Sequence, residues 1–133
     1  MTTSTDCAVF CDENEIVLEY CRLPLNKSVS FEDGSEKYII MDEGDMTEAQ
    51  RKVHLAHEIG HCMTGAFYHA YSPLETRSRC EYRANMWMVQ RLIPKSDLQQ
   101  AFERGIVEVW ELAEYFCVTE DVIRFACYEY FDK

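Results

Sequence analysis

The chain has 133 residues, of which 47% are hydrophobic, and a formal net charge of −11 at pH 7. This length suits one domain with a core of its own, so we expect a single domain over residues 1–133. The acidic balance disfavours nucleic acids and anionic membranes as partners, because both attract lysine and arginine, and no apolar stretch approaches the ~18 residues that a membrane helix needs.

A strand-rich region is predicted for residues 15–42. The residues before it are polar and show no sustained period, so we expect a loosely held start. Residues 16–21 are typical of a strand that ends near Pro24. Residues 28–31 alternate polar and apolar side chains, turn-forming residues follow, and residues 37–41 are again β-rich, which predicts a β-hairpin.

Two longer helices are predicted next. Thr47 and Gln50 have the spacing of a capping box and open a helical pattern that we place over residues 46–67. Residues 68–77, which include a Ser-Pro pair, break this pattern. A second helix is predicted over residues 78–92, because a proline follows shortly afterwards.

Residues 96–131 carry the signals of further helices. Ser96 and Gln99 match another capping box, and Gly105 is placed to end that helix. Two more helices follow, the last with Thr119 as its N-cap, over residues 107–116 and 120–131. Strands first and helices afterwards predict an α+β fold, in which a small antiparallel sheet packs on the active-site helices and a C-terminal helical segment follows.

Residues 57–61 read His-Glu-Ile-Gly-His and lie on the first of these helices. His57 and His61 are one helical turn apart on the same face, so both imidazoles can reach one ion. Glu58 beside them could take a proton from a water molecule that attacks a substrate. Gly60 costs the helix about 1 kcal/mol relative to alanine, so we expect another part of the chain to approach its backbone closely. The pattern predicts a catalytic zinc site.

A catalytic zinc ion takes three protein ligands. No further histidine follows His61 at the spacing that metzincins use, so the third ligand must come from elsewhere. Glu81 on the second helix is the candidate, and Asn85 on the same face could orient a histidine ring. Ser78 and Glu81 also match a capping box, which would occupy the carboxylate. We favour the ligand role because Glu75, the other acidic residue in this interval, lies in the predicted loop.

Other polar residues near the motif have competing interpretations. His54 lies one turn before His57, and a structural or surface role is expected because catalytic zinc keeps its fourth position open. The residues that follow the active-site helix include three hydrogen-bond donors, Tyr68, His69 and Tyr71. Any of them could stabilise the oxyanion that forms when a peptide carbonyl is attacked, although only their position recommends them.

The chain contains seven cysteines, which is an odd number, and they are scattered through apolar segments without a C-x-x-C pair. We interpret them as reduced thiols of a cytoplasmic protein, in agreement with an N-terminus that lacks the features of a signal peptide. Cys62 and Cys80 adjoin proposed ligands. Buried thiols at helix interfaces explain their positions as well as a redox role does.

The C-terminal residues 109–130 have the rhythm of a helix-turn-helix. A DNA-reading helix would carry basic side chains, whereas this one offers Glu120, Asp121 and Glu129 against Arg124 alone. Phosphate repulsion argues against DNA binding. The pair of helices is expected instead to cover the catalytic core or to bind a protein partner.

The stretches RKVHLAHEIGHCMTGAFY and CEYRANMWMVQRLIP resemble the ImmA/IrrE family of metallopeptidases. The resemblance covers residues 37–94 and implies a gluzincin-like site in which zinc is held by His57, His61 and Glu81. It also implies that Glu58 is the general base and that Asn85 supports a ligand. Members are small cytosolic proteins of bacteria and their mobile elements, such as prophages, and often cleave a helix-turn-helix repressor.

The sequence therefore predicts a zinc-dependent endopeptidase that hydrolyses a peptide bond in a regulatory protein, with a DNA-binding repressor as its expected partner. Two other functions stay open. The protein could bind and inhibit the repressor without cutting it, although an intact Glu58 argues against this. It could also be a structural-metal or redox-sensing domain, which would require cysteines rather than Glu81 to complete the site.

Overall fold

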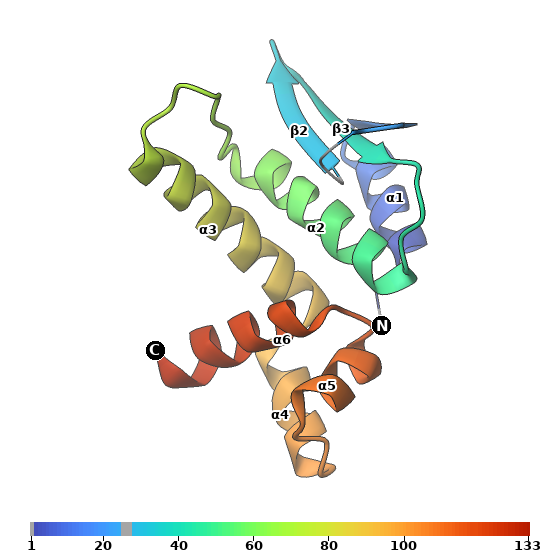
Figure 1. The fold of residues 1–133 in the computed structure, drawn as a ribbon, viewed down its shortest axis with the longest axis vertical. Coiled ribbons are helices and arrows are strands. Elements are labelled where there is room, and N and C mark those ends of the chain that lie inside the picture. The colour runs from blue at the N-terminus through green and yellow to red at the C-terminus, as the bar shows by residue number, and fades with distance from the viewer. Residues whose placement is uncertain (1, 25–27) are drawn as a thin grey trace.

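The computed structural model describes residues 2–24 and 28–133 (Figure 1). Within these residues the chain forms six α-helices, one π-helical turn and a three-stranded sheet. The predicted α+β class is confirmed. The elements in chain order are α1 (Ser4–Glu13), β1 (Ile16–Cys21), β2 (Ser28–Asp33), β3 (Glu36–Asp42), α2 (Glu48–Thr64), α3 (Leu74–Leu92), α4 (Lys95–Glu103), α5 (Val109–Phe116), α6 (Glu120–Cys127) and the π-helical turn Tyr128–Asp132.

The described strands form a mixed sheet in the order β1-β3-β2. The predicted hairpin is present: β2 and β3 are antiparallel, and Gly34 in the turn adopts a φ of +65° that glycine tolerates best. The expectation of a wholly antiparallel sheet is wrong, because β1 runs parallel to β3. Since β3 lies between β1 and β2, the pairing of β1 depends on a strand two elements later, which the local pattern of β1 does not reveal.

The start of the chain is ordered as helix α1, so the expectation of a loosely held start is also wrong. Thr3 and Asp6 form a reciprocal capping box, and the Ser4 hydroxyl donates to the Glu48 carboxylate of α2 at 2.6 Å. Cys7 and Cys11, one turn apart, are buried against α2 and β1. The two small thiols act as the apolar side of this helix, a role that a scan for large hydrophobic residues overlooks.

Helices α2 and α3 begin and end at different residues from those predicted. The capping box of Thr47 and Gln50 is confirmed, and α2 ends at Thr64 because Gly65 adopts a φ of +68°. Helix α3 begins at Leu74 and not at residue 78, directly after Pro73. Ser78 therefore lies inside α3, so the capping-box interpretation of Glu81 is wrong and its carboxylate is available for the site.

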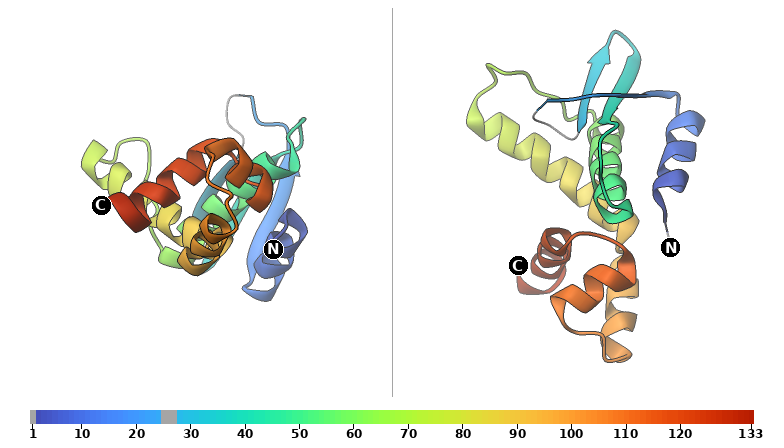
Figure 2. Two further views of the ribbon diagram at one scale, coloured as in Figure 1. Left: turned by 90° about the horizontal axis from the view of Figure 1, so that it is seen from below. Right: turned by 45° about the vertical axis from the view of Figure 1, so that its right-hand side comes forward.

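Helix α2 lies between α3 and α1, and it also packs against β2 and β3 of the sheet (Figures 1 and 2). Its apolar residues Leu55 and Ile59 are fully buried with Ile39 and Met41 of β3 and Val89 of α3. This packing fixes the orientation of the polar side chains that α2 directs away from the core. Residues 57–61 therefore lie on a helix that packs against α1, α3 and the sheet.

The C-terminal helices pack below α2 and α3 (Figure 2). Gly105 follows the end of α4 with a φ of +85°, as expected, and Thr119 occupies the N-cap position of α6. The predicted Ser96 capping box is wrong, because Pro94 occupies the N-cap position of α4. None of the helices in the described part of the chain is long and apolar enough to cross a membrane.

A buried lysine of α2 connects the residues before α1 with the end of α5. Lys52 is 2% exposed, and its ammonium group donates to the carbonyl oxygens of Phe116 at 2.7 Å and Thr2 at 2.9 Å. Phe116 is the last residue of α5, where carbonyl groups lack partners within the helix. Burial lowers the pKa of Lys52, and the two carbonyl acceptors compensate for part of its lost hydration.

Candidate metal centre

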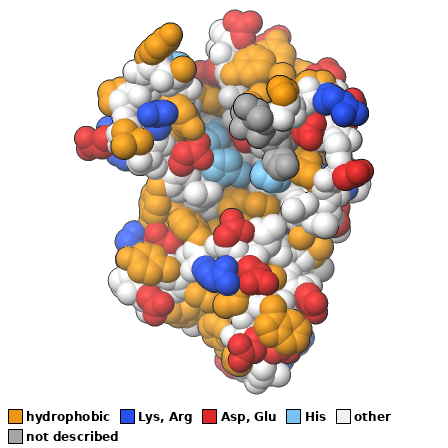
Figure 3. Space-filling model, viewed as in Figure 1, with side chains coloured by type: hydrophobic (Ala, Val, Ile, Leu, Met, Phe, Trp, Pro, Cys, Tyr) orange, Lys and Arg blue, Asp and Glu red, His pale blue; other side chains and the backbone are white. Residues whose placement is uncertain are grey.

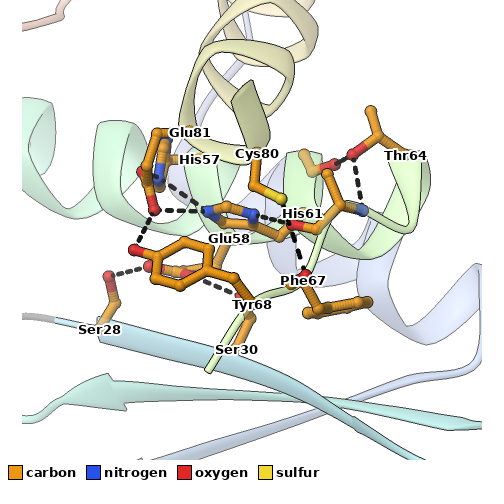
Figure 4. Close-up of polar contacts among 12 residues, drawn as sticks. Ser28, Ser30, His57, Glu58, His61, Thr64, Phe67, Tyr68, Cys80 and Glu81 are labelled. Carbon is orange, nitrogen blue, oxygen red and sulfur yellow. Dashed lines mark hydrogen bonds and ion pairs between the residues drawn. The ribbon is translucent and has the colours of Figure 1, made fainter. Parts of the chain in front are cut away.

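Helix α2 brings the two histidines of the motif together at the surface of a cleft. His57 and His61 lie one turn apart, and their Nε2 atoms are 3.2 Å from each other (Figure 4). His61 is 5% exposed and belongs to the buried part of α2, whereas His57 is half-buried. The spacing of the motif therefore has the predicted effect: two imidazole nitrogens point to the same place.

Helix α3 supplies the third group. One oxygen of Glu81, Oε2, lies 2.7 Å from His57 Nε2, and the other, Oε1, lies 3.2 Å from His61 Nε2. One ligand atom from each of the three residues lies within 4.8 Å of the others, which makes them a group that could hold a metal ion. All three side chains therefore come from the helices α2 and α3.

A backbone carbonyl fixes the ring of His61. Nδ1 of His61 lies 2.6 Å from the carbonyl oxygen of Ala66, which follows the left-handed turn at Gly65. A carbonyl only accepts hydrogen bonds, so Nδ1 carries the proton and donates it, and in the neutral ring Nε2 presents a lone pair. Partners of this kind orient metal-binding histidines. The sequence does not identify this partner, since any residue has a carbonyl.

The charges of the site fit a cation. Burial alone would lower the pKa of His61, but the hydrogen bonds with Glu81 and the Ala66 carbonyl outweigh burial, so the pKa lies above its ordinary value. Hydrogen bonds from His57 and His61 hold the pKa of Glu81 far below its usual range. Two imidazole lone pairs and a carboxylate repel one another unless a positive charge lies among them, and a divalent metal ion supplies that charge.

The three groups line a cleft of about 490 Å³ between β2, α2 and the segment that follows α2. Figure 3 shows histidine side chains in the hollow between the two halves of the molecule. Strand β2 contributes Ser28, Val29 and Ser30 to one wall, and Phe67 and Tyr68 contribute to another. The candidate metal centre is therefore open to the outside of the molecule.

Residues 11–128 match the model of a peptidase family described as the IrrE N-terminal-like domain. The chain belongs to this family. No curated protein matches the sequence. The match agrees with the resemblance drawn from the two helical stretches, and extends it over the first strand and the C-terminal helices.

In this IrrE-like domain the carboxylate of Glu58 points toward the sheet. Glu58 is 7% exposed, and its two oxygens accept hydrogen bonds from the hydroxyls of Ser28 at 2.8 Å and Ser30 at 2.6 Å (Figure 4). The sequence did not predict either serine as part of the site. Their alternation in Ser-Val-Ser was a signal that they share one face of a strand, but not that this face meets Glu58.

The three predicted oxyanion donors lie in different places. The Tyr68 hydroxyl donates to Glu81 Oε1 at 2.7 Å, and this hydrogen bond raises the pKa of Tyr68 to about 12. His69 and Tyr71 bond to each other through the Tyr71 amide and His69 Nδ1, and Tyr71 is 94% exposed. In the described part of the chain Tyr68 lines the cleft, whereas His69 and Tyr71 do not.

The remaining residues singled out by the sequence lie around the metal centre. His54 lines the same cleft, outside the group of three ligands. Asn85 lies one turn beyond Glu81 and lines a neighbouring depression, and its role in orienting a histidine ring stays a prediction. Cys62 is buried, and the Cys80 thiol contacts the Phe67 carbonyl at 3.6 Å. Among the described residues no cysteine joins the ligand group.

Proposed function

We propose that this protein is a zinc-dependent endopeptidase that cleaves a regulatory protein. The observation that carries the proposal is the convergence of His57, His61 and Glu81 on one point beside Glu58, in a chain of a peptidase family. Two imidazoles and a carboxylate form a ligand set used by catalytic zinc, which leaves a fourth position for water or substrate. Zinc supplies the Lewis acid that activates a water molecule and polarises the scissile carbonyl.

The protein's own groups handle the protons of the reaction. Glu58 accepts a proton from the attacking water and passes it to the nitrogen of the leaving amine. The Tyr68 hydroxyl donates its single proton to Glu81 in the structure, and in this proposal it turns from Glu81 to the carbonyl oxygen as that oxygen becomes negative. The Ala66 carbonyl keeps the ring of His61 in the orientation that presents Nε2.

We further propose that the substrate is a helix-turn-helix repressor of a mobile element, and that the protein acts in the cytoplasm. The family resemblance supports this substrate class. The net charge of −11 also supports it, because a DNA-binding protein presents a basic face that an acidic protein attracts. The seven cysteines are free in the structure, as a reducing compartment would keep them.

The deciding experiment incubates the zinc-loaded protein with the repressor encoded beside its gene and maps the products by mass spectrometry. We expect one or a few defined cuts. Glu58→Gln keeps the shape of the side chain but cannot accept a proton, so cleavage should fall by about 10²- to 10⁴-fold. A repressor that is bound but never cut by the unaltered protein would favour the alternative, a non-catalytic anti-repressor.

A further inference from the structure

Two hydroxyl groups of the edge strand β2 hold the carboxylate of Glu58 (Figure 4). Ser28 donates to Oε2 and Ser30 donates to Oε1, so each oxygen has its own donor. The two serines alternate with Val29, and residues i and i+2 of a strand lie on the same face. Strand β2 thus presents a pair of donors whose spacing matches the two oxygens of one carboxylate.

The donors rest on a fixed backbone. In the register of β2 with β3, Ser28 lies opposite Met41 and Ser30 lies opposite Ile39, and both of these partners are completely buried. A carboxylate with a single donor can still turn about its last torsion angle, whereas one donor on each oxygen fixes its plane. Hydroxyl-to-carboxylate bonds are charge-assisted and among the stronger hydrogen bonds in proteins.

Hydration alone does not account for the pair. Glu58 is only 7% exposed, but it lines the cleft together with both serines, so its carboxylate keeps some access to water besides the two hydroxyls. The serines therefore add direction as well as replacing lost hydration. Catalytic groups need their orientation fixed by supporting residues, because small misplacements reduce rate strongly.

We propose that Ser28 and Ser30 are positioning residues, which fix the plane and place of the Glu58 carboxylate in the cleft beside the candidate metal centre for proton transfer. This inference rests on the proposed function, since it assumes that Glu58 is the general base. The serines do not touch the reacting atoms. They act through Glu58, and their removal should affect the reacting state more than metal binding or folding.

The test uses acetohydroxamic acid, a small metal-binding probe whose acidic proton a neighbouring carboxylate can accept. The full-length protein is loaded with cobalt(II), and its visible absorption spectrum is followed during titration with the probe. We expect Glu58→Gln to weaken probe binding, and the double variant Ser28→Ala/Ser30→Ala to weaken it by about tenfold, in line with the loss of charge-assisted hydrogen bonds. Cobalt content should stay at the level of the unaltered protein.

Matched variants separate positioning from a general effect on the fold. Ser28→Thr/Ser30→Thr keeps both hydroxyls and should restore probe binding relative to the alanine pair. Ser35→Ala removes an exposed hydroxyl from the turn of the same hairpin and should leave probe binding unchanged. Urea unfolding of all variants identifies any change that comes from stability alone.

The outcomes distinguish the two proposals. Weakened binding in Glu58→Gln with unchanged binding in the alanine pair would overturn the positioning role and leave the proposed function intact. Tighter binding in the alanine pair would also overturn it, since the serines would then restrain Glu58. A protein that takes up no cobalt, or whose probe binding ignores Glu58→Gln, would refute the proposed function, and the positioning role would fall with it. With the repressor as substrate, the alanine pair should lower kcat and leave KM nearly unchanged.

Discussion

Ala84 of α3 lies so close to Gly60 of α2 that a Cβ atom on Gly60 would come within 2.6 Å of the Ala84 carbonyl oxygen. Real Cβ atoms essentially never approach this closely, and the neighbouring atom belongs to the backbone of a helix. The predicted close approach to Gly60 is therefore present. It occurs between the two helices that carry the candidate metal ligands.

Gly60→Ala should destabilise the protein by about 1–3 kcal/mol, because the added methyl group forces the two helices apart. Helix propensity alone predicts the opposite sign, a gain of about 1 kcal/mol. Urea unfolding measures the difference. Adding Ala84→Gly should not restore stability, since the contact is with the backbone. A stabilised Gly60→Ala protein would show that the helices can separate without cost.

The purified protein should contain about one zinc ion per chain, as expected for a three-ligand site. Elemental analysis should find the metal lost in His57→Ala, His61→Ala and Glu81→Ala. It should be kept in Glu58→Gln, and in Glu75→Ala as a control for an exposed acid of the same helix. Full zinc content in Glu81→Ala would contradict the assignment of the third ligand.

The metal-free and zinc-loaded proteins should respond to pH in opposite ways. The raised pKa of His61 stabilises the metal-free fold below its ordinary value of 6.5, and this contribution is lost as the pH rises through the folded-state value. The lowered pKa of Glu81 stabilises the fold above its ordinary value of 4.5, and this contribution is lost as the pH falls through the folded-state value. Both contributions are present together between pH 4.5 and pH 6.5, the ordinary pKa values of the two groups, so the metal-free protein should be most stable in this interval.

Zinc needs deprotonated histidines, so its stabilising effect should grow as the pH rises above 6.5. Thermal unfolding of chelator-treated and zinc-loaded protein from about pH 5 to 8 checks both trends, because histidine changes its charge within this interval. His69→Gln should leave them unchanged, because His69 is exposed and bonds locally. A zinc effect that is constant over this interval would contradict the prediction.

The cysteines of the buried core should be unreactive toward alkylating reagents in the folded protein. Burial raises the pKa of Cys11 and Cys62 to about 12, whereas Cys21 is exposed. Iodoacetamide at about pH 8 should therefore label Cys21 in the native state, and label the other two only after denaturation, since the thiolate is the nucleophile. Mass spectrometry of digested samples locates the label. Rapid native labelling of Cys62 would revive the redox interpretation.

Cleavage of the repressor should slow as the salt concentration rises from about 50 to 300 mM, over which the Debye length falls from roughly 14 to 6 Å. A short peptide spanning the same bond should be a poor substrate at every salt concentration. The expected docking surface is the acidic and aromatic depression lined by Trp110, Glu111, Glu114 and Tyr115. Among the aromatic residues of the C-terminal helices, the side chains of Trp110 and Tyr128 are more than half exposed, whereas Phe116 belongs to the core.

Glu111→Gln/Glu114→Gln should weaken the salt dependence, because long-range attraction acts mainly on the encounter rate. Glu15→Gln/Glu19→Gln removes the same two charges from exposed acids outside this surface and provides the matched control. If the short peptide is cut as efficiently as the whole repressor, with no salt dependence in either, specificity must lie in the cleft beside the metal centre.

The sequence was most informative where the chemistry depends on spacing within one helix. The positions of His57, Glu58 and His61 follow from the helical period, and the cost of a helical glycine pointed to the close contact at Gly60. Glu81 could be predicted because few acidic residues were available on the next helix. These arguments need only local geometry and the order of elements.

The rest of the site depends on contacts between distant segments. The hydrogen bond between Ser30 and Glu58 joins residues 28 positions apart in the chain. The local sequence around either residue does not indicate that β2 packs against α2. The partner of His61 is a backbone carbonyl, which every residue possesses. The boundary of α3 was misplaced because Ser78 and Glu81 imitate a helix start, whereas Pro73 sets the actual one.

The parallel pairing of β1 with β3 also has a consequence for folding. Strand β2 separates β1 from its partner β3 in the sequence, whereas β2 and β3 are neighbours and can pair as a local hairpin. The hairpin closes a short loop, and joining β1 to it closes a longer one, which costs more chain entropy. Chain entropy therefore favours an order in which the hairpin forms first and β1 and helix α1 dock onto it. In that order, the two elements that precede the hairpin in the sequence reach their places after it.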